Sequence, residues 1–151
     1  MSIKFPAPQP GEVLELVHTI MHKYRALQYR FLRDGPHEIT HMDGRVLHFF
    51  GAHPGASQKE LALRLGRDKA QLARLVKGLR EIGLLEAQAD LADGRSVKLS
   101  LTAAGQAVRA QLQQQSERLA GAAVTGLSVD EQAQLRSLLG RIDANLDADR
   151  L

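Results

Sequence analysis

Residues 57 to 102 read SQKELALRLGRDKAQLARLVKGLREIGLLEAQADLADGRSVKLSLT, and this stretch decides the fold. Ser57 and Glu60 have the spacing of a capping box that starts a helix, and Gly66 falls in the turn after that helix. Asp68 then suits the N-cap of a second helix. Two helices joined by a short turn that contains glycine predict a helix-turn-helix.

The second helix is expected to run from Lys69 to about Ile82 and to have two different faces. Apolar side chains recur on one face at helical spacing, and these are Leu72, Leu75, Val76, Leu79 and Ile82. The opposite face carries Ala70, Ala73, Arg74, Lys77 and Glu81. Small side chains beside cations suit a helix that must approach a polyanion closely.

A β-hairpin is expected directly after this helix. Apolar and polar residues alternate from Val97 to Leu101, which is the period of a half-buried strand. The pair Asp93-Gly94 is a turn signal before it, and residues 86–90 are the expected partner strand because a hairpin needs one. A hairpin that follows the second helix makes the motif a winged helix-turn-helix, with Arg95 near the tip of the wing.

These segments carry a resemblance to a known family. DGRSVKLSLTAAG, from Asp93 to Gly105, resembles the wing motif D-x-R-x-x-x-L-x-L-T-x-x-G of the MarR family of bacterial transcription regulators. LVKGLREIGLL, at residues 75–85, is similar to the end of that family's recognition helix, and the flanking helices match its plan. One departure is Glu86, where many members carry Arg or Lys. The resemblance implies a homodimeric regulator that binds double-stranded DNA and often responds to a small aromatic or phenolic effector.

The composition limits the classes of protein to which the chain can belong. Its 151 residues suit one domain or a compact lobe with extensions, and 44% hydrophobic with 25% charged residues is ordinary for a globular protein. The absence of cysteine excludes disulfides and thiolate zinc sites. No apolar run approaches the roughly 20 residues of a membrane span, and no signal peptide opens the chain. We therefore expect a cytoplasmic protein without membrane contact.

Positive charge is concentrated in the central segment. Residues 54–102 contain nine Lys or Arg and six Asp or Glu, an excess of +3, whereas residues 1–53 sum to +1 and residues 103–151 to −1. An excess of this size over some fifty residues also occurs by chance. Together with the wing motif, it favours an interaction of this segment with nucleic acid.

Helices are expected on both sides of the central segment, so the fold class is mainly α (α+β). The predicted helices cover residues 11–33, 40–52, 103–125 and 128–146. Thr40 with Asp43, and Ser128 with Glu131, have the spacing of capping boxes at the starts of two of these helices. The predicted organisation has an N-terminal extension at residues 1–10, a helical dimerisation region at 11–36 and 103–151, and a winged DNA-binding lobe at 37–102.

The first and last helices have more apolar surface than a small winged lobe needs. The first carries Val13, Val17, Ile20, Met21, Tyr24, Leu27 and Phe31, and the last carries Leu135, Leu138, Leu139, Ile142 and Leu146. Burial against a symmetry-related copy would remove these side chains from water. A helical bundle within one chain is the alternative.

Histidines raise the possibility of a metal site. His37 and His41 match the zinc-protease pattern H-E-x-x-H, but Thr40 is the expected cap of the next helix, so the two rings would not lie one turn apart. His18 and His22 do lie one turn apart on a predicted helix and could form a regulatory metal site. A polar helix surface that merely contains histidines is the simpler interpretation.

The sequence predicts a DNA-binding regulator, with a repressor as the expected type, and neither an enzyme nor a cofactor site. Within the recognition helix, Gln71 can pair with adenine and Arg74 with guanine, while Arg95 suits a narrow minor groove. The expected DNA-binding residues are Ser57, Gln58, Lys69, Ala70, Gln71, Arg74, Lys77, Asp93, Arg95 and Ser96. A metal-responsive regulator and a winged module that binds only protein are the alternatives.

Overall fold

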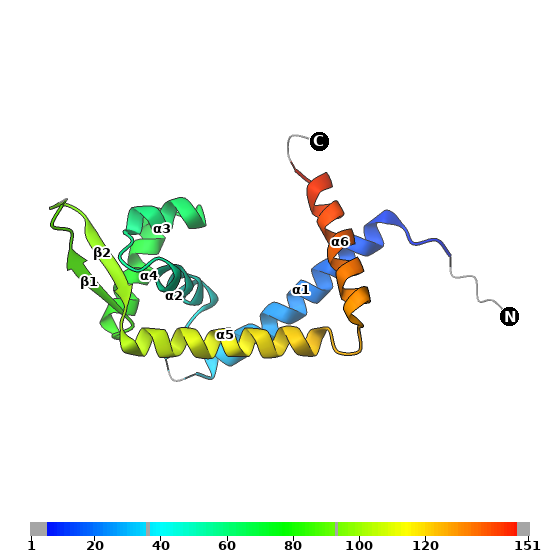
Figure 1. Ribbon diagram of the computed structural model, residues 1–151, viewed down its shortest axis with the longest axis horizontal. Coiled ribbons are helices and arrows are strands. Elements are labelled where there is room, and N and C mark those ends of the chain that lie inside the picture. The colour runs from blue at the N-terminus through cyan, green and yellow to red at the C-terminus, as the bar shows by residue number, and fades with distance from the viewer. Residues whose placement is uncertain (1–5, 36, 93, 148–151) are drawn as a thin grey trace. The chain divides into compact units, whose positions relative to one another are not determined.

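The computed structural model describes residues 6–35, 37–92 and 94–147, and these form six helices and one two-stranded antiparallel sheet (Figure 1). The elements are α1 (Pro10–Arg33), α2 (His41–Ala52), α3 (Gln58–Leu65), α4 (Lys69–Glu81), β1 (Leu85–Ala89), β2 (Val97–Leu101), α5 (Ala103–Ala123) and α6 (Val129–Asn145). Their order and types confirm the expected winged helix-turn-helix with helices on both sides. The chain divides into two compact units, Met1–Ser116 and Glu117–Leu151.

The core of the larger unit lies between α2, α3, α4 and the hairpin. The most deeply buried side chains are Val46, Leu47, Phe50, Leu61, Leu72, Val76, Leu79, Leu84 and Leu99. Full burial of one such side chain stabilises a fold by about 1.5–3 kcal/mol. The aromatic rings of Phe49 and Phe50 meet edge to face, with centroids 5.1 Å apart. This core holds the helix-turn-helix and the hairpin together as one lobe.

Helix boundaries follow the expected caps. Thr40 and Asp43 form a reciprocal capping box, because the Asp43 N–H donates to Thr40 Oγ1 at 3.1 Å and the Thr40 N–H donates to Asp43 Oδ2 at 3.0 Å. Ser128 and Glu131 form the same arrangement at the start of α6. Gly66 ends α3 with φ of 60°, a conformation that glycine adopts without strain.

The hairpin is joined firmly to the rest of the lobe. Leu85 pairs with Leu101 and Ala89 with Val97 in the antiparallel register. The Leu99 N–H donates to the carbonyl oxygen of Ala56 at 2.9 Å, so the segment before α3 extends the sheet on the other side of β2. These bonds fix the direction in which the hairpin leaves the core.

Several local predictions were wrong. Ile82 is not part of the buried face, because α4 ends at Glu81 and the chain turns through Gly83 with φ of 79°, which leaves Ile82 48% exposed. The first strand begins at Leu85, one residue earlier than expected, and Val97, next to the loop of the hairpin, is exposed. Helix α5 ends two residues before the expected position.

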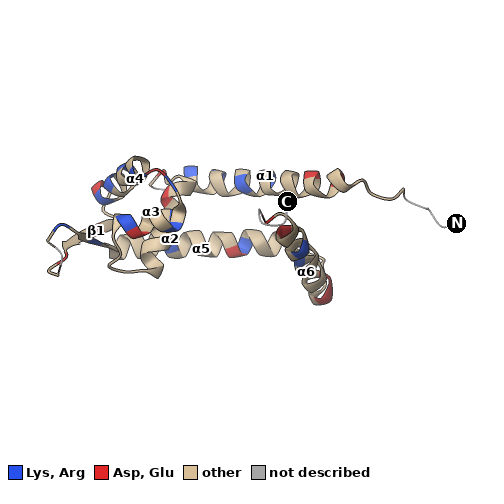
Figure 2. Cartoon of the chain, turned by 90° about the horizontal axis from the view of Figure 1, so that it is seen from above, with Lys and Arg blue, Asp and Glu red and all other residues tan. Residues whose placement is uncertain are grey.

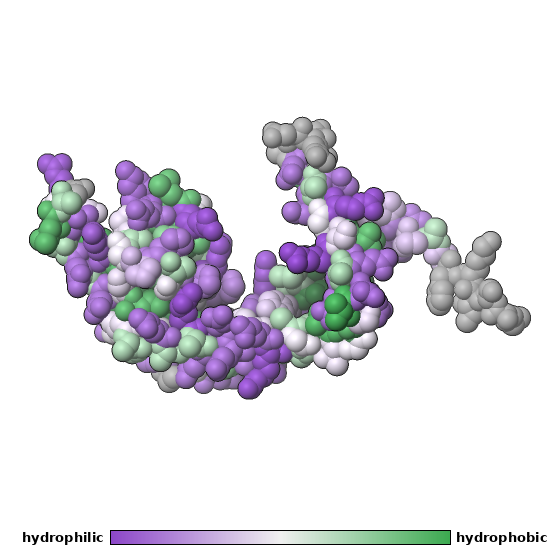
Figure 3. Space-filling model, in the orientation of Figure 1, coloured by the Kyte–Doolittle hydropathy of each residue, from purple (hydrophilic) through white to green (hydrophobic). Residues whose placement is uncertain are grey.

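Both terminal helices expose apolar side chains. In α1 these include Leu16 and Ile20, and α6 has no buried residue. The exposed large apolar residues of α6 are Val129, Leu135, Leu138 and Leu139, and Leu146 at its C-cap is also exposed. Figure 3 shows hydrophobic residues at the surface around the turn from α5 to α6. A contiguous apolar helix face that is open to water is unfavourable.

Some predictions concern residues outside the described ranges. These are the first half of the extension at residues 1–5, Pro36 in the predicted stop after α1, Asp93 in the hairpin turn, and residues 148–151. Among the residues that the structure does describe, no helix is both long and apolar enough to cross a membrane. The division into a dimerisation region and a winged lobe at residues 37–102 stays a prediction.

Candidate nucleic-acid interface

The polar face of α4 is open to solvent along its length. Leu72, Val76 and Leu79 anchor the helix in the core, and this orientation directs the opposite face outward. The residues expected to contact DNA on this helix are all exposed, namely Lys69, Ala70, Gln71, Arg74 and Lys77. Figure 2 shows Lys and Arg along α4. The helix has four cations and a single acidic residue at its end, so a polyanion would be attracted to it.

Two hydrogen bonds shape the start of α4. Asp68 caps the helix by accepting a hydrogen bond from the Ala70 N–H at 3.0 Å, and no reciprocal bond from Gln71 completes a capping box. The Arg74 Nε donates weakly to the carbonyl oxygen of Ala70 at 3.4 Å, so this side chain lies back along its own helix. Ala70 adds no bulk at this point, which leaves room for a close approach to a ligand.

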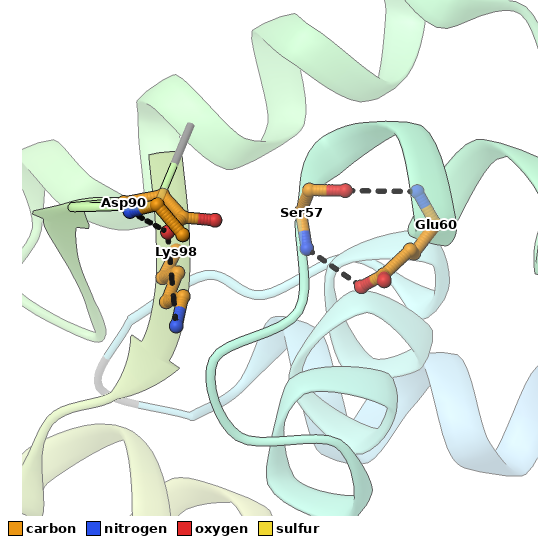
Figure 4. A network of polar contacts seen from close by, with 5 residues as sticks. Ser57, Glu60, Asp90 and Lys98 are labelled. Atoms are coloured by element: carbon orange, nitrogen blue, oxygen red, sulfur yellow. Dashed lines mark hydrogen bonds and ion pairs between the residues drawn. The ribbon is translucent and has the colours of Figure 1, made fainter. Parts of the chain in front are cut away.

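Ser57 and Gln58 lie at the start of α3. Ser57 forms a capping box with Glu60, in which the Glu60 N–H donates to Ser57 Oγ at 3.2 Å and the Ser57 N–H donates to Glu60 Oε2 at 2.9 Å (Figure 4). The Ser57 hydroxyl accepts in this contact, so its own proton is available for another acceptor. Gln58 is exposed at the first helical position.

The tip of the hairpin is held by polar contacts around Asp90. The Asp90 N–H donates to the carbonyl oxygen of Ser96 at 3.1 Å, and the Asp90 carboxylate accepts from the Ala92 N–H at 2.9 Å. Lys98 Nζ lies 4.0 Å from Asp90 Oδ1 (Figure 4). These contacts form the base of the loop that carries Arg95, whose side chain is exposed. Figure 3 shows hydrophobic surface near the same tip, where Leu91 is fully exposed.

The described histidines do not form a metal-binding cluster. Helix α2 begins at His41, so His37 precedes the helix, as the sequence predicts, and the two rings do not lie one turn apart on a continuous helix as a zinc protease requires. His18 and His22 both lie exposed on α1. Within the described ranges, no group of three or more His, Cys, Asp or Glu residues could hold a metal ion.

One feature of the larger unit was missed at the sequence level. A cavity of about 450 Å³ lies between α1, α2, α3 and the first part of α5, and Arg45, Arg64 and Arg109 line it. Gly51, the second-last residue of α2, was the available signal, because glycine inside a helix costs about 0.5–1 kcal/mol and often marks a close approach. The partner in that approach is Arg109, which no local pattern identifies.

The fold and the exposed α4 face define a winged helix-turn-helix protein. The family model described as the MarR family matches residues 37–96. Apo wild-type MarR from E. coli is similar at a TM-score of 0.72 and 27% identity over 91% of this chain and 98% of that one. Residues 37–96 therefore match the MarR family, and the chain as a whole resembles MarR-family transcription regulators in sequence and fold.

Two similar structures were determined with nucleic acid. FabT from Streptococcus pneumoniae in complex with DNA has a TM-score of 0.83 and 17% identity, and the match covers 92% of this chain and 98% of that one. A mutant of S. aureus MepR bound to an oligodeoxyribonucleotide has a TM-score of 0.66 and 23% identity over 89% and 98%. At these identities the likeness establishes the fold.

Proposed function

We propose that the protein binds a pseudo-palindromic DNA operator as a homodimer, with α4 of each subunit in a major groove. The single observation that carries this proposal is the exposed polar face of α4, which holds Lys69, Gln71, Arg74 and Lys77 on a rigidly anchored helix. The similar folds of FabT and MepR, both determined with nucleic acid, support it. The proposal assigns no catalytic step to any residue.

The residues of the interface have separate tasks in this proposal. Gln71 and Arg74 contact base edges, because an amide can pair with adenine and a guanidinium with guanine through two hydrogen bonds each. Ser57, Lys69 and Lys77 bind phosphates and set the register of the helix. Ala70 permits the close approach. Gln58 at the start of α3 makes a further contact with DNA, and so do Asp93 and Ser96 of the wing.

Arg95 is assigned to the minor groove beside each half-site. A narrow minor groove has enhanced negative potential, and an exposed guanidinium at a hairpin tip can enter it. The polar contacts around Asp90 support this assignment, because they order the base of the loop before DNA binds. Less conformational freedom is then lost on binding.

The exposed apolar faces of α1 and α6 are assigned to the dimer. Leu16 and Ile20 on α1, and Leu135 and Leu138 on α6, are open to solvent in the single chain. A second copy would cover both faces, and two-fold symmetry would then place two α4 helices for two half-sites.

We assign the protein a cytoplasmic role as a repressor that a small effector releases from its operator. The cavity of the larger unit supports an effector, because its volume is in the range of small-molecule sites. Neither rival is favoured: within the described residues no metal cluster supports the metal-responsive regulator, and the similar DNA complexes argue against a module that binds only protein.

Selection of DNA by the purified protein tests the function. Random duplexes retained by the protein are sequenced, with and without added zinc. We expect one enriched sequence with two-fold symmetry in both conditions. Enrichment that depends on zinc would favour the metal-responsive alternative, and the absence of any enriched sequence would contradict the proposal.

A further inference from the structure

A surface hollow that carries charges of both signs lies beside the proposed DNA-binding face. It has a volume of about 370 Å³ and lies between the second half of α4 and the first part of β1. Two cations, two carboxylates and two apolar residues line it, namely Lys77, Arg80, Glu81, Leu85, Glu86 and Ala87. The proposed function assigns Lys77 to a DNA phosphate. A phosphate bound there would meet carboxylates as well as cations.

The two carboxylates of this hollow are not used to stabilise the fold. Glu81 and Glu86 are both exposed. Within the described ranges, no ion pair shorter than 4.0 Å joins either of them to a cation. Their negative charges therefore act on whatever approaches the hollow from solvent.

The strand β1 fixes Glu86 at the surface. Glu86 pairs with Ser100 in the antiparallel register, and its neighbours are the core residue Leu85 and the partly buried Ala87. Successive side chains of a strand point to opposite faces, so the packing of these two neighbours directs Glu86 away from the core. Its carboxylate cannot be withdrawn into the lobe while the hairpin keeps this register.

The positive charge of α4 is balanced only at this hollow. Of the 13 residues of α4, four are Lys or Arg and one, Glu81 at the end of the helix, is acidic (Figure 2). The helix by itself would attract a polyanion along most of its length. Glu86 brings a second carboxylate to the same surface from another element, so two cations share the hollow with two anions. The excess of positive charge on the DNA-binding face therefore stops there.

We propose that Glu86 lowers the affinity of the protein for DNA by repelling the phosphate that Lys77 binds. The inference deepens the proposed function and rests on it in one respect, namely the contact of Lys77 with a phosphate. Charges that share one hollow are only partly screened from each other, because the screening length at physiological ionic strength is about 8 Å.

The repulsion is independent of the DNA sequence. Phosphate contacts fix the position of a protein on DNA but do not distinguish bases, and they supply nearly all of non-specific binding. A carboxylate that opposes one phosphate contact in each subunit therefore weakens binding to operator and to other DNA alike. The base contacts assigned to Gln71 and Arg74 keep their preference. Glu86 thus sets how tightly the protein holds DNA, and the recognition helix sets which DNA it holds.

Neutralisation of one carboxylate tests the repulsion. Glu86→Gln removes the charge and keeps the size of the side chain, and Glu15→Gln removes the same charge from the exposed surface of α1 as a matched control. Fluorescence anisotropy at one fixed salt concentration measures binding to the enriched operator and to a scrambled duplex of equal length. We expect Glu86→Gln to bind both duplexes about three- to tenfold more tightly than the unaltered protein, because a surface charge contact contributes a small factor in each of two subunits. Glu15→Gln should stay within about twofold.

The same titrations show what would overturn the proposal. An unchanged affinity of Glu86→Gln for both duplexes would overturn it. A loss of affinity for the operator alone would also overturn it, since Glu86 would then act as an acceptor for a cytosine amino group. The gain should shrink as the salt concentration rises, because screening weakens the repulsion. A gain that is independent of salt would contradict an electrostatic origin.

A double-mutant cycle with Lys77 tests whether the repulsion acts in this hollow. In the Lys77→Ala background no phosphate is held beside Glu86, so the gain from Glu86→Gln should fall to less than about half. An equal gain in both backgrounds would contradict a local repulsion. Failures of the two proposals are distinguishable. A protein that enriches no duplex defeats operator binding and this inference with it, whereas operator binding that Glu86→Gln leaves unchanged defeats only the role of Glu86.

Discussion

The backbone at Gly105 lies directly against the carbonyl oxygen of Leu84, so closely that a Cβ atom at residue 105 would collide with it. Thr102 reinforces this junction, because its hydroxyl donates to the carbonyl oxygen of Gly83 at 2.6 Å and accepts from the Gly105 N–H at 3.0 Å. The start of α5 is thereby fixed to the end of the helix-turn-helix. The final T-x-x-G of the wing motif has a physical explanation in these contacts.

Gly105→Ala is therefore expected to destabilise the protein. The added methyl group meets backbone that cannot move aside, and overpacking of this kind typically costs about 1–3 kcal/mol. Gly121→Ala is the matched control on the same helix, since a Cβ there meets nothing within 4 Å. Chemical denaturation should show a lower free energy of unfolding for the first variant and an equal or higher value for the second. Equal stability of both variants would contradict the close contact.

The wing assignment predicts a loss of affinity without a loss of fold. Arg95→Ala should weaken operator binding by on the order of 1–3 kcal/mol, because an exposed guanidinium no longer enters the minor groove. Arg33→Ala removes an exposed cation outside the lobe and serves as the control. Titrations at one fixed salt concentration measure both. An unchanged operator affinity for Arg95→Ala would remove this residue from the interface.

The assignment of α6 to the dimer predicts that changes in its apolar face alter the molar mass of the protein in solution. Deletion of residues 135–151 removes most of the apolar face of α6 and should produce monomers or aggregates. Leu138→Glu places a charge in the same surface and should weaken the dimer, whereas Leu91→Glu on the fully exposed hairpin tip should not. Light scattering gives the molar mass of each variant. A soluble dimer of unchanged stability after Leu138→Glu would exclude this face from the interface.

The pKa of His41 predicts a dependence of stability on pH. Burial, followed by the charges of Arg45 and Arg25, lowers the pKa of His41 in the folded protein. The unfolded chain has the ordinary value of about 6.5, so it takes up the proton first as the pH falls. The neutral His41 ring therefore contributes to stability above the unfolded value of about 6.5, and this contribution is lost as the pH falls from there through the folded pKa. Arg45→Gln should raise the pKa of His41 in an NMR titration, and an unchanged or lower pKa would contradict the charge effect.

Local sequence signals predicted the helix starts well. The boxes Thr40–Asp43, Ser57–Glu60 and Ser128–Glu131 are confirmed because each forms from side chains three residues apart, so no distant contact is required. The end of α4 was predicted one residue too late. Ile82 has the right spacing for the buried face, but Gly83 ends the helix and the apolar side chain of Ile82 stays at the surface.

The candidate sites differ in how far sequence could predict them. The exposed face of α4 follows from one helical pattern, so the exposure of Lys69, Arg74 and Lys77 could be predicted from spacing alone. The cavity could not, because it is assembled from four elements that are distant in the chain. Gly51 and Arg109 meet only through the packing of α2 against α5, which no local period reports.

The salt dependence of operator binding tests the central claim, that two α4 helices bind the two half-sites of one DNA duplex. Lys69, Lys77 and Arg95 from both subunits would neutralise about six phosphates, so the slope of log affinity against log salt should be near −5, at roughly −0.9 per contact. The enriched duplex should have half-sites about 10 base pairs apart.

Two variants of α4 make this measurement decisive. Lys77→Ala should reduce the slope by about 2 and keep the preferred sequence, because it removes one phosphate contact from each subunit. Arg74→Ala should instead relax the preference within each half-site. If both substitutions changed the sequence preference equally, or if the selected duplex had no two-fold symmetry, the assignment of α4 to the major groove would be contradicted.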